Sequence, residues 1–184
     1  MRYGADHKQA TRARILDAAM ILLARGGAGA VTVHGVMRGA DLSHGGFYAH
    51  FESREALLEA ALTAAAERTL SALFGAPADA AQPALRDVIG RYLGRAHLEA
   101  DTGCPLPATC GGALDESSDA ARRRTVQRYR DALAAVASDQ PTADALLALM
   151  VGGLAVARAL GGDDGEAVLR ACRMTARQLA TPAS

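Results

Sequence analysis

The stretch Thr32–Arg54, TVHGVMRGADLSHGGFYAHFESR, decides the fold of this chain. Apolar residues recur with helical spacing in its first half and again in its second half, which predicts two short helices. The turn between them falls at residues 40–43, where Asp41 tolerates a left-handed backbone and Ser43 can cap the next helix. Two helices that cross through so short a turn form a helix-turn-helix, whose second helix can enter a DNA major groove.

We expect residues 43–50 to form the recognition helix. Two glycines lie inside it, and two interpretations of Gly45 and Gly46 stay open. They permit a close approach of the backbone to DNA, or they mark a frayed helix that Phe47 and Phe51 anchor in the core. His44 can donate to a base edge or a phosphate, or it is an ordinary surface histidine. The exposed candidates are Ser43, His44, Gly45, Gly46 and Tyr48.

This pattern resembles the DNA-binding signature of the TetR family of bacterial repressors over about fifty residues. The chain departs from that signature at Asp41, where the family usually has glycine, and at Arg54, where it usually has lysine. The resemblance implies backbone contacts to DNA from Thr32, Tyr48, His50 and Arg54. The matching residues are Thr32-Val33, Val36, Ala40, Leu42-Ser43, Gly45, Tyr48, His50-Phe51, Glu55 and Leu57.

Composition predicts an all-α protein. Half of the 184 residues are apolar, only 4% are aromatic and none is Trp, so Ala, Leu and Val must supply most of the core. The net charge of zero hides an asymmetry. Residues 1–54 carry seven Lys and Arg against four Asp and Glu, whereas residues 55–184 carry thirteen against sixteen. The basic end is the end that holds the helix-turn-helix, as binding to phosphates requires.

Helical periodicity predicts a two-domain layout, with a DNA-binding head at residues 1–54 and a ligand-binding and dimerisation body at residues 55–184. The segment at about 142–160 is apolar nearly all round and carries small residues. Together with 166–179 it predicts a homodimer interface, because such a helix must be covered on every side. The expected helices are 8–25, the two short ones, 54–74, 84–100, 117–137, 142–160 and 166–179.

A small-molecule effector site is expected in the body. The polar candidates around a largely apolar cavity are Tyr92, His97, Cys104, Cys110 and Tyr129. The irregular stretch 102–112 leaves two interpretations of its cysteines open. They are small buried residues, or they sense oxidants or electrophiles as a disulfide or a reactive thiol.

The sequence shows no catalytic constellation, no metal-ligand spacing and no phosphate loop, so neither an enzyme nor a bound cofactor is predicted. An odd number of cysteines and the lack of a signal-peptide pattern favour the cytoplasm. The longest apolar run, residues 145–157, is shorter than the ~20 residues that cross a bilayer, so we expect no membrane span. The resemblance implies a repressor that leaves double-stranded operator DNA when the effector binds. The alternative is the same regulator switched by thiol chemistry at Cys104 or Cys110.

Overall fold

The structure is a computed structural model that describes residues 2–75, 82–100, 103–110 and 116–181. These residues form helices and turns, and no strand occurs among them, which confirms the all-α prediction. The elements are α1 (Arg2–Ala30), α2 (Val33–Gly39), the 3₁₀ helix η1 (His44–Ala49), α3 (Arg54–Phe74), α4 (Leu85–Tyr92), α5 (Arg95–Leu98), α6 (Leu106–Thr109), α7 (Glu116–Ala134), α8 (Gln140–Leu160) and α9 (Gly162–Leu179).

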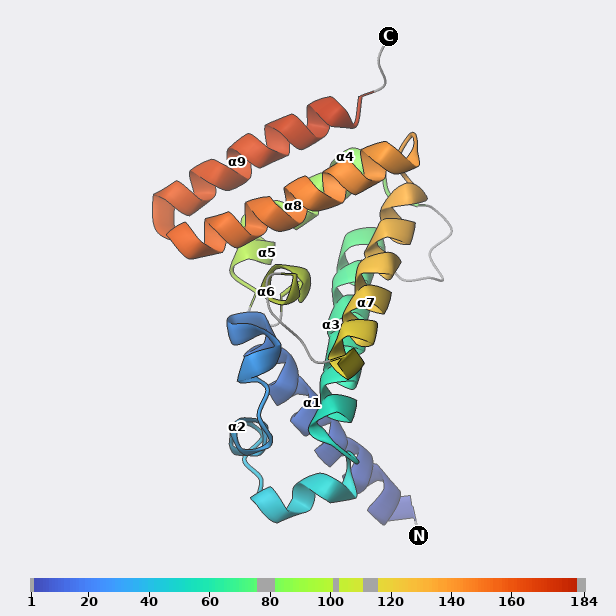
Figure 1. The fold of residues 1–184 in the computed structure, drawn as a ribbon, viewed down its shortest axis with the longest axis vertical. Helices are drawn as coiled ribbons and strands as arrows, with labels where there is room; N and C mark the ends of the chain where they lie inside the picture. The colour runs from blue at the N-terminus through green and yellow to red at the C-terminus, as the bar shows by residue number, and fades with distance from the viewer. Residues whose placement is uncertain (1, 76–81, 101–102, 111–115, 182–184) are drawn as a thin grey trace.

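The helices form an elongated molecule with the two chain ends far apart (Figure 1). Helices α1, α2 and η1 make up the end near the N-terminus. Helices α8 and α9 lie side by side at the other end, and α3 and α7 run alongside each other between the two ends. The short helix α6 lies between α1 and α8 and contacts both of them.

Helix α1 is longer than the sequence predicted. It begins at Arg2, so the segment before Lys8 is helical where a frayed arm was expected. The predicted stop at the glycine pair is visible as a kink at Gly27, which has φ 69° and ψ −168°. Helical geometry resumes beyond the kink and continues to Ala30. Gly27 therefore interrupts the helix close to its predicted end, and a short helical segment follows it.

Helix α3 joins the head to the body. Ser53 caps it as predicted, since the Ser53 hydroxyl accepts a hydrogen bond of 3.0 Å from the Ala56 amide. Buried side chains of α3 up to Ala65 belong to the core of the head, and those from Ala66 onward belong to the core of the body. Packing thus divides the chain inside α3, later than the expected division after residue 54. Ala121 of α7 also lies in the core of the head, so α7 reaches down to it.

Two body segments differ from their predicted form. The single helix expected over 84–100 is α4 and α5, which are separated at Gly94, where the backbone is extended. Glycine has low helix propensity, and a side chain there would lie 2.9 Å from the Gly90 carbonyl oxygen. The loop expected at residues 161–165 is a tight turn at Gly161 and Gly162, which both have positive φ, and α9 starts directly after it.

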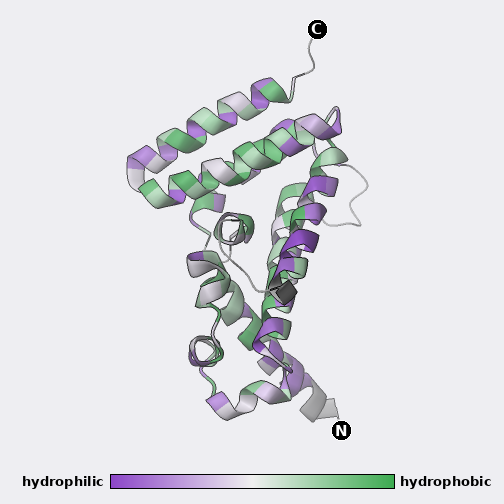
Figure 2. Ribbon diagram, viewed as in Figure 1, coloured by the Kyte–Doolittle hydropathy of each residue, from purple (hydrophilic) through white to green (hydrophobic). Residues whose placement is uncertain are grey.

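Helix α8 is apolar along most of its length (Figure 2). Among the described residues it is the one helix long and apolar enough to cross a membrane. Of its most apolar stretch of 18 residues, 39% is buried inside the fold. One face packs into the body core through residues such as Leu146, Met150 and Leu154. Large apolar side chains elsewhere on α8 and α9 are exposed, namely those of Val156, Leu160, Met174 and Leu179.

Candidate functional site

The turn between α2 and η1 has the predicted geometry. Thr32 begins α2, and its hydroxyl accepts a hydrogen bond of 3.1 Å from the Gly35 amide. Asp41 takes the left-handed conformation with φ 54°, the one non-glycine residue with positive φ among those described. The amide of Leu42 then donates to the Met37 carbonyl over 2.9 Å and closes the turn. Asp41 thus fills a backbone position that favours glycine.

The recognition segment is a 3₁₀ helix, not an α-helix. Ser43 precedes it but makes no side-chain cap, so its predicted capping bond is wrong. Phe47 is fully buried, and its ring lies 6.0 Å from that of Phe51, which confirms the anchoring role of both. Tyr48 is 67% exposed with its ring edge-on to Phe47 at 5.2 Å. The anchors therefore present the Tyr48 hydroxyl to the outside.

The two glycines of η1 lie in different surroundings. A side chain at Gly45 would meet nothing within 4 Å, so this position is open to the outside. A side chain at Gly46 would lie 3.7 Å from the terminal methyl group of Met37, which is an ordinary contact. Neither glycine is needed for packing within the chain, and their backbone approach to DNA stays a prediction.

Three arginines of the head are committed to contacts within the head. Arg54 donates from Nε to the Val31 carbonyl over 2.7 Å, and from a terminal nitrogen to the Ala28 carbonyl over 2.6 Å. Arg54 therefore has an internal role, and the contact with the DNA backbone that the resemblance implied for it stays a prediction. Arg14 donates to the carbonyl of Ala40 over 2.5 Å. The third residue, Arg12, lies over the Phe51 ring at 4.6 Å.

His50 follows η1 and is half-buried. Its Nδ1 atom is buried and has no hydrogen-bond partner among the described residues. A ring with one nitrogen turned inward presents less donor capacity to DNA than the resemblance implied. Its contact to DNA is therefore still a prediction.

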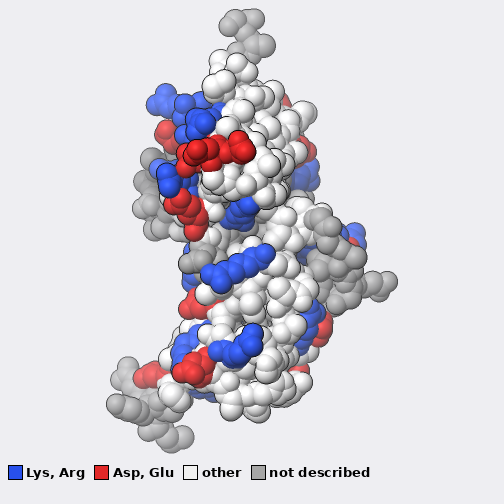
Figure 3. All heavy atoms as spheres, turned by 90° about the vertical axis from the view of Figure 1, so that its left-hand side faces the viewer, with Lys and Arg blue, Asp and Glu red and all other residues white. Residues whose placement is uncertain are grey.

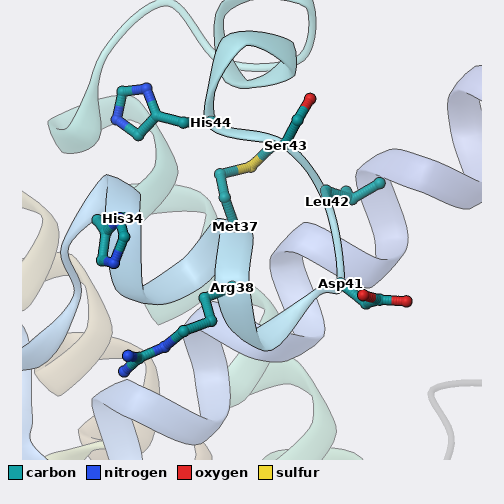
Figure 4. Close-up of a pocket in the computed structure, with 7 residues that line it drawn as sticks. All are labelled: His34, Met37, Arg38, Asp41, Leu42, Ser43 and His44. Atoms are coloured by element: carbon teal, nitrogen blue, oxygen red, sulfur yellow. The ribbon is translucent and has the colours of Figure 1, made fainter.

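An open hollow of about 380 Å³ lies between α2 and the start of η1. His44, His34 and Arg38 lie along one side of it, whereas the Asp41 carboxylate points to the opposite side (Figure 4). His34 and Arg38 were missed at the sequence level, although their spacing of four places both on one face of a helix. The lining residues are His34, Met37, Arg38, Asp41, Leu42, Ser43 and His44.

Permanent charge is sparse on the face of the molecule that Figure 3 shows. Basic and acidic side chains lie close to one another there, and much of the surface carries no charge. The face shown in Figure 3 therefore carries no broad basic patch.

The body brings four of the five predicted effector residues together. The Tyr92 hydroxyl donates to the Cys104 sulfur over 3.3 Å, and the Cys104 thiol donates to the Tyr129 oxygen over 3.5 Å. The His97 ring lies 4.7 Å from that of Tyr92. Cys110, by contrast, is exposed and takes no part in this chain of hydrogen bonds. We call Tyr92, His97, Cys104 and Tyr129 the buried cluster.

Burial controls ionisation in the buried cluster. It raises the pKa of the Tyr92 and Tyr129 hydroxyls well above their usual value and also raises the pKa of the Cys104 thiol. The pKa of His97 is lowered to about 4, first because the ring is buried and second because Arg158 is nearby. All four side chains are thus neutral near pH 7.

The cysteines show no sign of activation. Cys104, Cys110 and Cys172 are all free thiols. Partial burial raises the pKa of Cys110 despite the opposing charge of Arg122. A raised pKa lowers the fraction of thiolate, which is the reactive form. Across the described residues, no three His, Cys, Asp or Glu side chains gather as a metal site would require.

The comparisons with known proteins give one family match, over the helix-turn-helix, and several similar folds. Residues 15–61 match the family described as bacterial regulatory proteins, tetR family. No curated protein sequence matches the chain. The fold is similar to reduced NemR from E. coli, with 20% identity, coverage of 95% of this chain and 100% of that one, and a TM-score of 0.72. It is also similar to a TetR-family transcriptional regulator from Agrobacterium tumefaciens, with 19% identity, coverage of 91% and 98%, and a TM-score of 0.71.

A third similar structure is a TetR-family transcriptional regulator from Cytophaga hutchinsonii. It has 18% identity, coverage of 95% of this chain and 94% of that one, and a TM-score of 0.71. At such low identity these structures establish the fold. The sequence match to the helix-turn-helix links that fold to DNA binding.

Proposed function

We propose that this chain, whose residues 15–61 match the tetR family of bacterial regulatory proteins, is a cytoplasmic, homodimeric repressor released from its operator by a small, largely apolar effector. The proposed head runs from α1 into the first half of α3, and the rest of the chain is the body. In each subunit η1 enters a major groove of double-stranded DNA. Two heads related by a two-fold axis would occupy grooves ~34 Å apart and read a near-palindrome.

The observation that carries the DNA-binding proposal is the way η1 is held. Phe47 and Phe51 fix it to the core, which leaves Tyr48, His44 and Gly45 on the outside. A hydroxyl and an imidazole N–H donate to phosphate oxygens or base edges, and an open glycine allows a close approach of the backbone. Thr32, Ser43 and Gly46 flank these groups at the ends of α2 and η1.

Exposed apolar side chains support the dimer. Val156 and Leu160 of α8 are 49% and 56% exposed, and Met174 of α9 is 66% exposed. Gly152 lies on α8 with nothing within 4 Å of a side chain built there, so a second backbone could approach closely. Covering this surface with a second copy removes apolar area from water and explains why α8 is apolar nearly all round.

The buried cluster supports an effector that is mainly apolar and has one or two hydrogen-bonding groups. Tyr92 and Tyr129 reach the same sulfur from α4 and α7, and apolar core residues surround them. The buried Nε2 atom of His97 has no hydrogen-bond partner among the described residues, so a ligand hydroxyl or carbonyl could satisfy it. The effector releases DNA only if it binds the off-DNA arrangement better.

The direct test selects a duplex from a random-sequence library with the unmodified protein and then measures its release by a panel of small apolar compounds. We expect at least one compound to lower DNA affinity, and we expect Tyr92→Phe/Tyr129→Phe to weaken its effect while DNA binding without the compound is kept. Failure of the unmodified protein to select any duplex would overturn the DNA-binding proposal. A compound effect unchanged by the double substitution would overturn the placement of the site.

A thiol switch is the second candidate, and the exposure of Cys110 is the observation that favours it. The raised pKa of Cys104 and of Cys110 opposes it. Treatment of the DNA-bound protein with N-ethylmaleimide separates the two proposals. We expect Cys110 to react slowly without DNA release, and Cys104 to react only after unfolding. Release that is lost in Cys110→Ser or Cys104→Ser would make the protein a thiol sensor.

A further inference from the structure

We infer that His34 and His44, on either side of the hollow between α2 and η1, bind DNA as imidazolium ions, so that DNA binding takes up protons and strengthens as pH falls. This inference rests on the proposed DNA-binding function and deepens it. His34 and His44 would contribute to DNA affinity and specificity, and pH would control their contribution.

The first step is that three of the permanent cations on the head make contacts within the head. Of its seven Lys and Arg residues, Arg54 and Arg14 donate to backbone carbonyls and Arg12 lies over the Phe51 ring. These three keep their charge, but each of them makes a contact within the head. DNA affinity depends on donors and charges that reach phosphates directly.

The second step is the abundance of histidine at the same end of the chain. Four of the five histidines lie within residues 1–54, which equals the number of acidic residues there. Both His34 and His44 are exposed. Protonation of both would add two positive charges to residues 1–54, which carry seven Lys and Arg against four Asp and Glu.

The third step is the arrangement of charge around the hollow. His44, His34 and Arg38 lie along one side, and the Asp41 carboxylate points to the other (Figure 4). From α1, Arg14 reaches the turn and donates to the carbonyls of Ala40 and Asp41. Met37 lies between the two sides and gives the hollow an apolar floor. The side of the hollow that holds both histidines therefore also holds the Arg38 guanidinium.

The consequence follows from linkage. A phosphate brought into the hollow places negative charge beside both histidines and favours their protonated form in the complex. A neutral imidazole has one N–H donor, whereas the imidazolium ion has two and a positive charge. The DNA complex must then bind more protons than the free components, and its affinity must rise as pH falls through the range in which histidine titrates.

The experiment measures the affinity of the full-length protein for the library-selected duplex, and for a mixed-sequence duplex of about 30 base pairs at low salt. Binding is followed from about pH 6 to about pH 8. We expect affinity to fall roughly ten-fold per participating histidine over that range. In His34→Gln/His44→Gln we expect a flat profile, with an affinity at the upper pH close to that of the unmodified protein.

Two variants control the interpretation. His7→Gln removes a histidine from α1, outside the hollow, and should keep the pH dependence. Arg38→Gln removes a cation that does not titrate, so it should weaken binding at every pH and leave the dependence in place. His97 is excluded as the source, because its pKa of about 4 lies below the range of the measurement. Calorimetry in buffers of different ionisation enthalpy should show net proton uptake on binding near pH 7.

The outcomes are distinct. Binding that does not vary with pH overturns the inference and leaves the proposed function standing. A pH dependence that survives in His34→Gln/His44→Gln also overturns it. Failure to bind either duplex at any pH would overturn the DNA-binding function itself.

Discussion

The carbonyl oxygen of Ala108 lies against the kink of α1 at Gly27, where a side chain would come within 2.6 Å of it. Gly27 is left-handed, with φ 69°, and α6 packs there against the head. One residue of α1 and one residue of the segment that follows Cys104 are therefore in backbone contact. This contact is a direct physical link between the head and the segment that carries part of the buried cluster.

Replacing Gly27 with alanine should destabilise the protein by about 1–3 kcal/mol, because alanine resists positive φ and its methyl group would meet the Ala108 backbone. At this chain length the melting temperature should fall by roughly 2–4 °C per kcal/mol. Gly29→Ala is the matched control, since a side chain there meets nothing within 4 Å. Equal melting temperatures for the two variants would contradict the contact.

Arg54 and Tyr48 should separate stability from DNA binding. Arg54→Met removes the side-chain donor to the Val31 carbonyl and one of the two donors to the Ala28 carbonyl, and should cost about 1–3 kcal/mol of unfolding free energy. Tyr48→Ala removes an exposed side chain and should change that free energy by less than ~0.5 kcal/mol. DNA affinity should fall in both variants. Chemical denaturation and DNA titration of the same samples measure both effects, and a fully stable Arg54→Met would refute the internal role of Arg54.

His97 should make the fold sensitive to acid. Its pKa is about 4 in the folded protein, below the 6.5 of a free histidine, so the unfolded chain binds more protons between these values. The contribution of His97 to the free energy of unfolding is therefore fully present above pH 6.5. It decreases by about 3 kcal/mol as the pH falls toward 4. His97→Gln should flatten this part of the stability profile, whereas His7→Gln should not. Parallel profiles for the unmodified protein and His97→Gln would show that His97 is not the source.

The two adjacent glycines of α8 should behave differently. A side chain at Gly152 meets nothing within 4 Å, so Gly152→Glu should leave the subunit folded and yield monomers. A side chain at Gly153 would lie 2.7 Å from the Cys172 sulfur, so Gly153→Glu should unfold the body. Sedimentation and circular dichroism distinguish these results. A dimeric Gly152→Glu would remove α8 from the interface.

Local signals in the sequence were enough to predict the helix-turn-helix. The turn at Asp41, the cap at Ser53 and the buried Phe47 each depend on a few neighbouring residues. The inward bonds of Arg54 were not predictable in this way. They join residues more than twenty positions apart, and only the packed head brings them together.

The body was predicted less well than the head. Four of the five candidate effector residues lie together in the buried cluster, whereas Cys110 does not, and their role in binding an effector stays a prediction. The break at Gly94 was missed, since one glycine in a helical pattern does not by itself end a helix. His34 and Arg38 were not predicted, although their spacing of four on α2 was visible in the sequence.

Hydroxyl-radical footprinting of the library-selected duplex with the unmodified protein tests the central claim most directly. A dimer that places one η1 in each of two successive major grooves predicts two protected half-sites about one helical turn apart on the same side of the duplex. Both should disappear together in Tyr48→Ala at the same protein concentration. A single protected site, or two sites unaffected by Tyr48→Ala, would contradict the account.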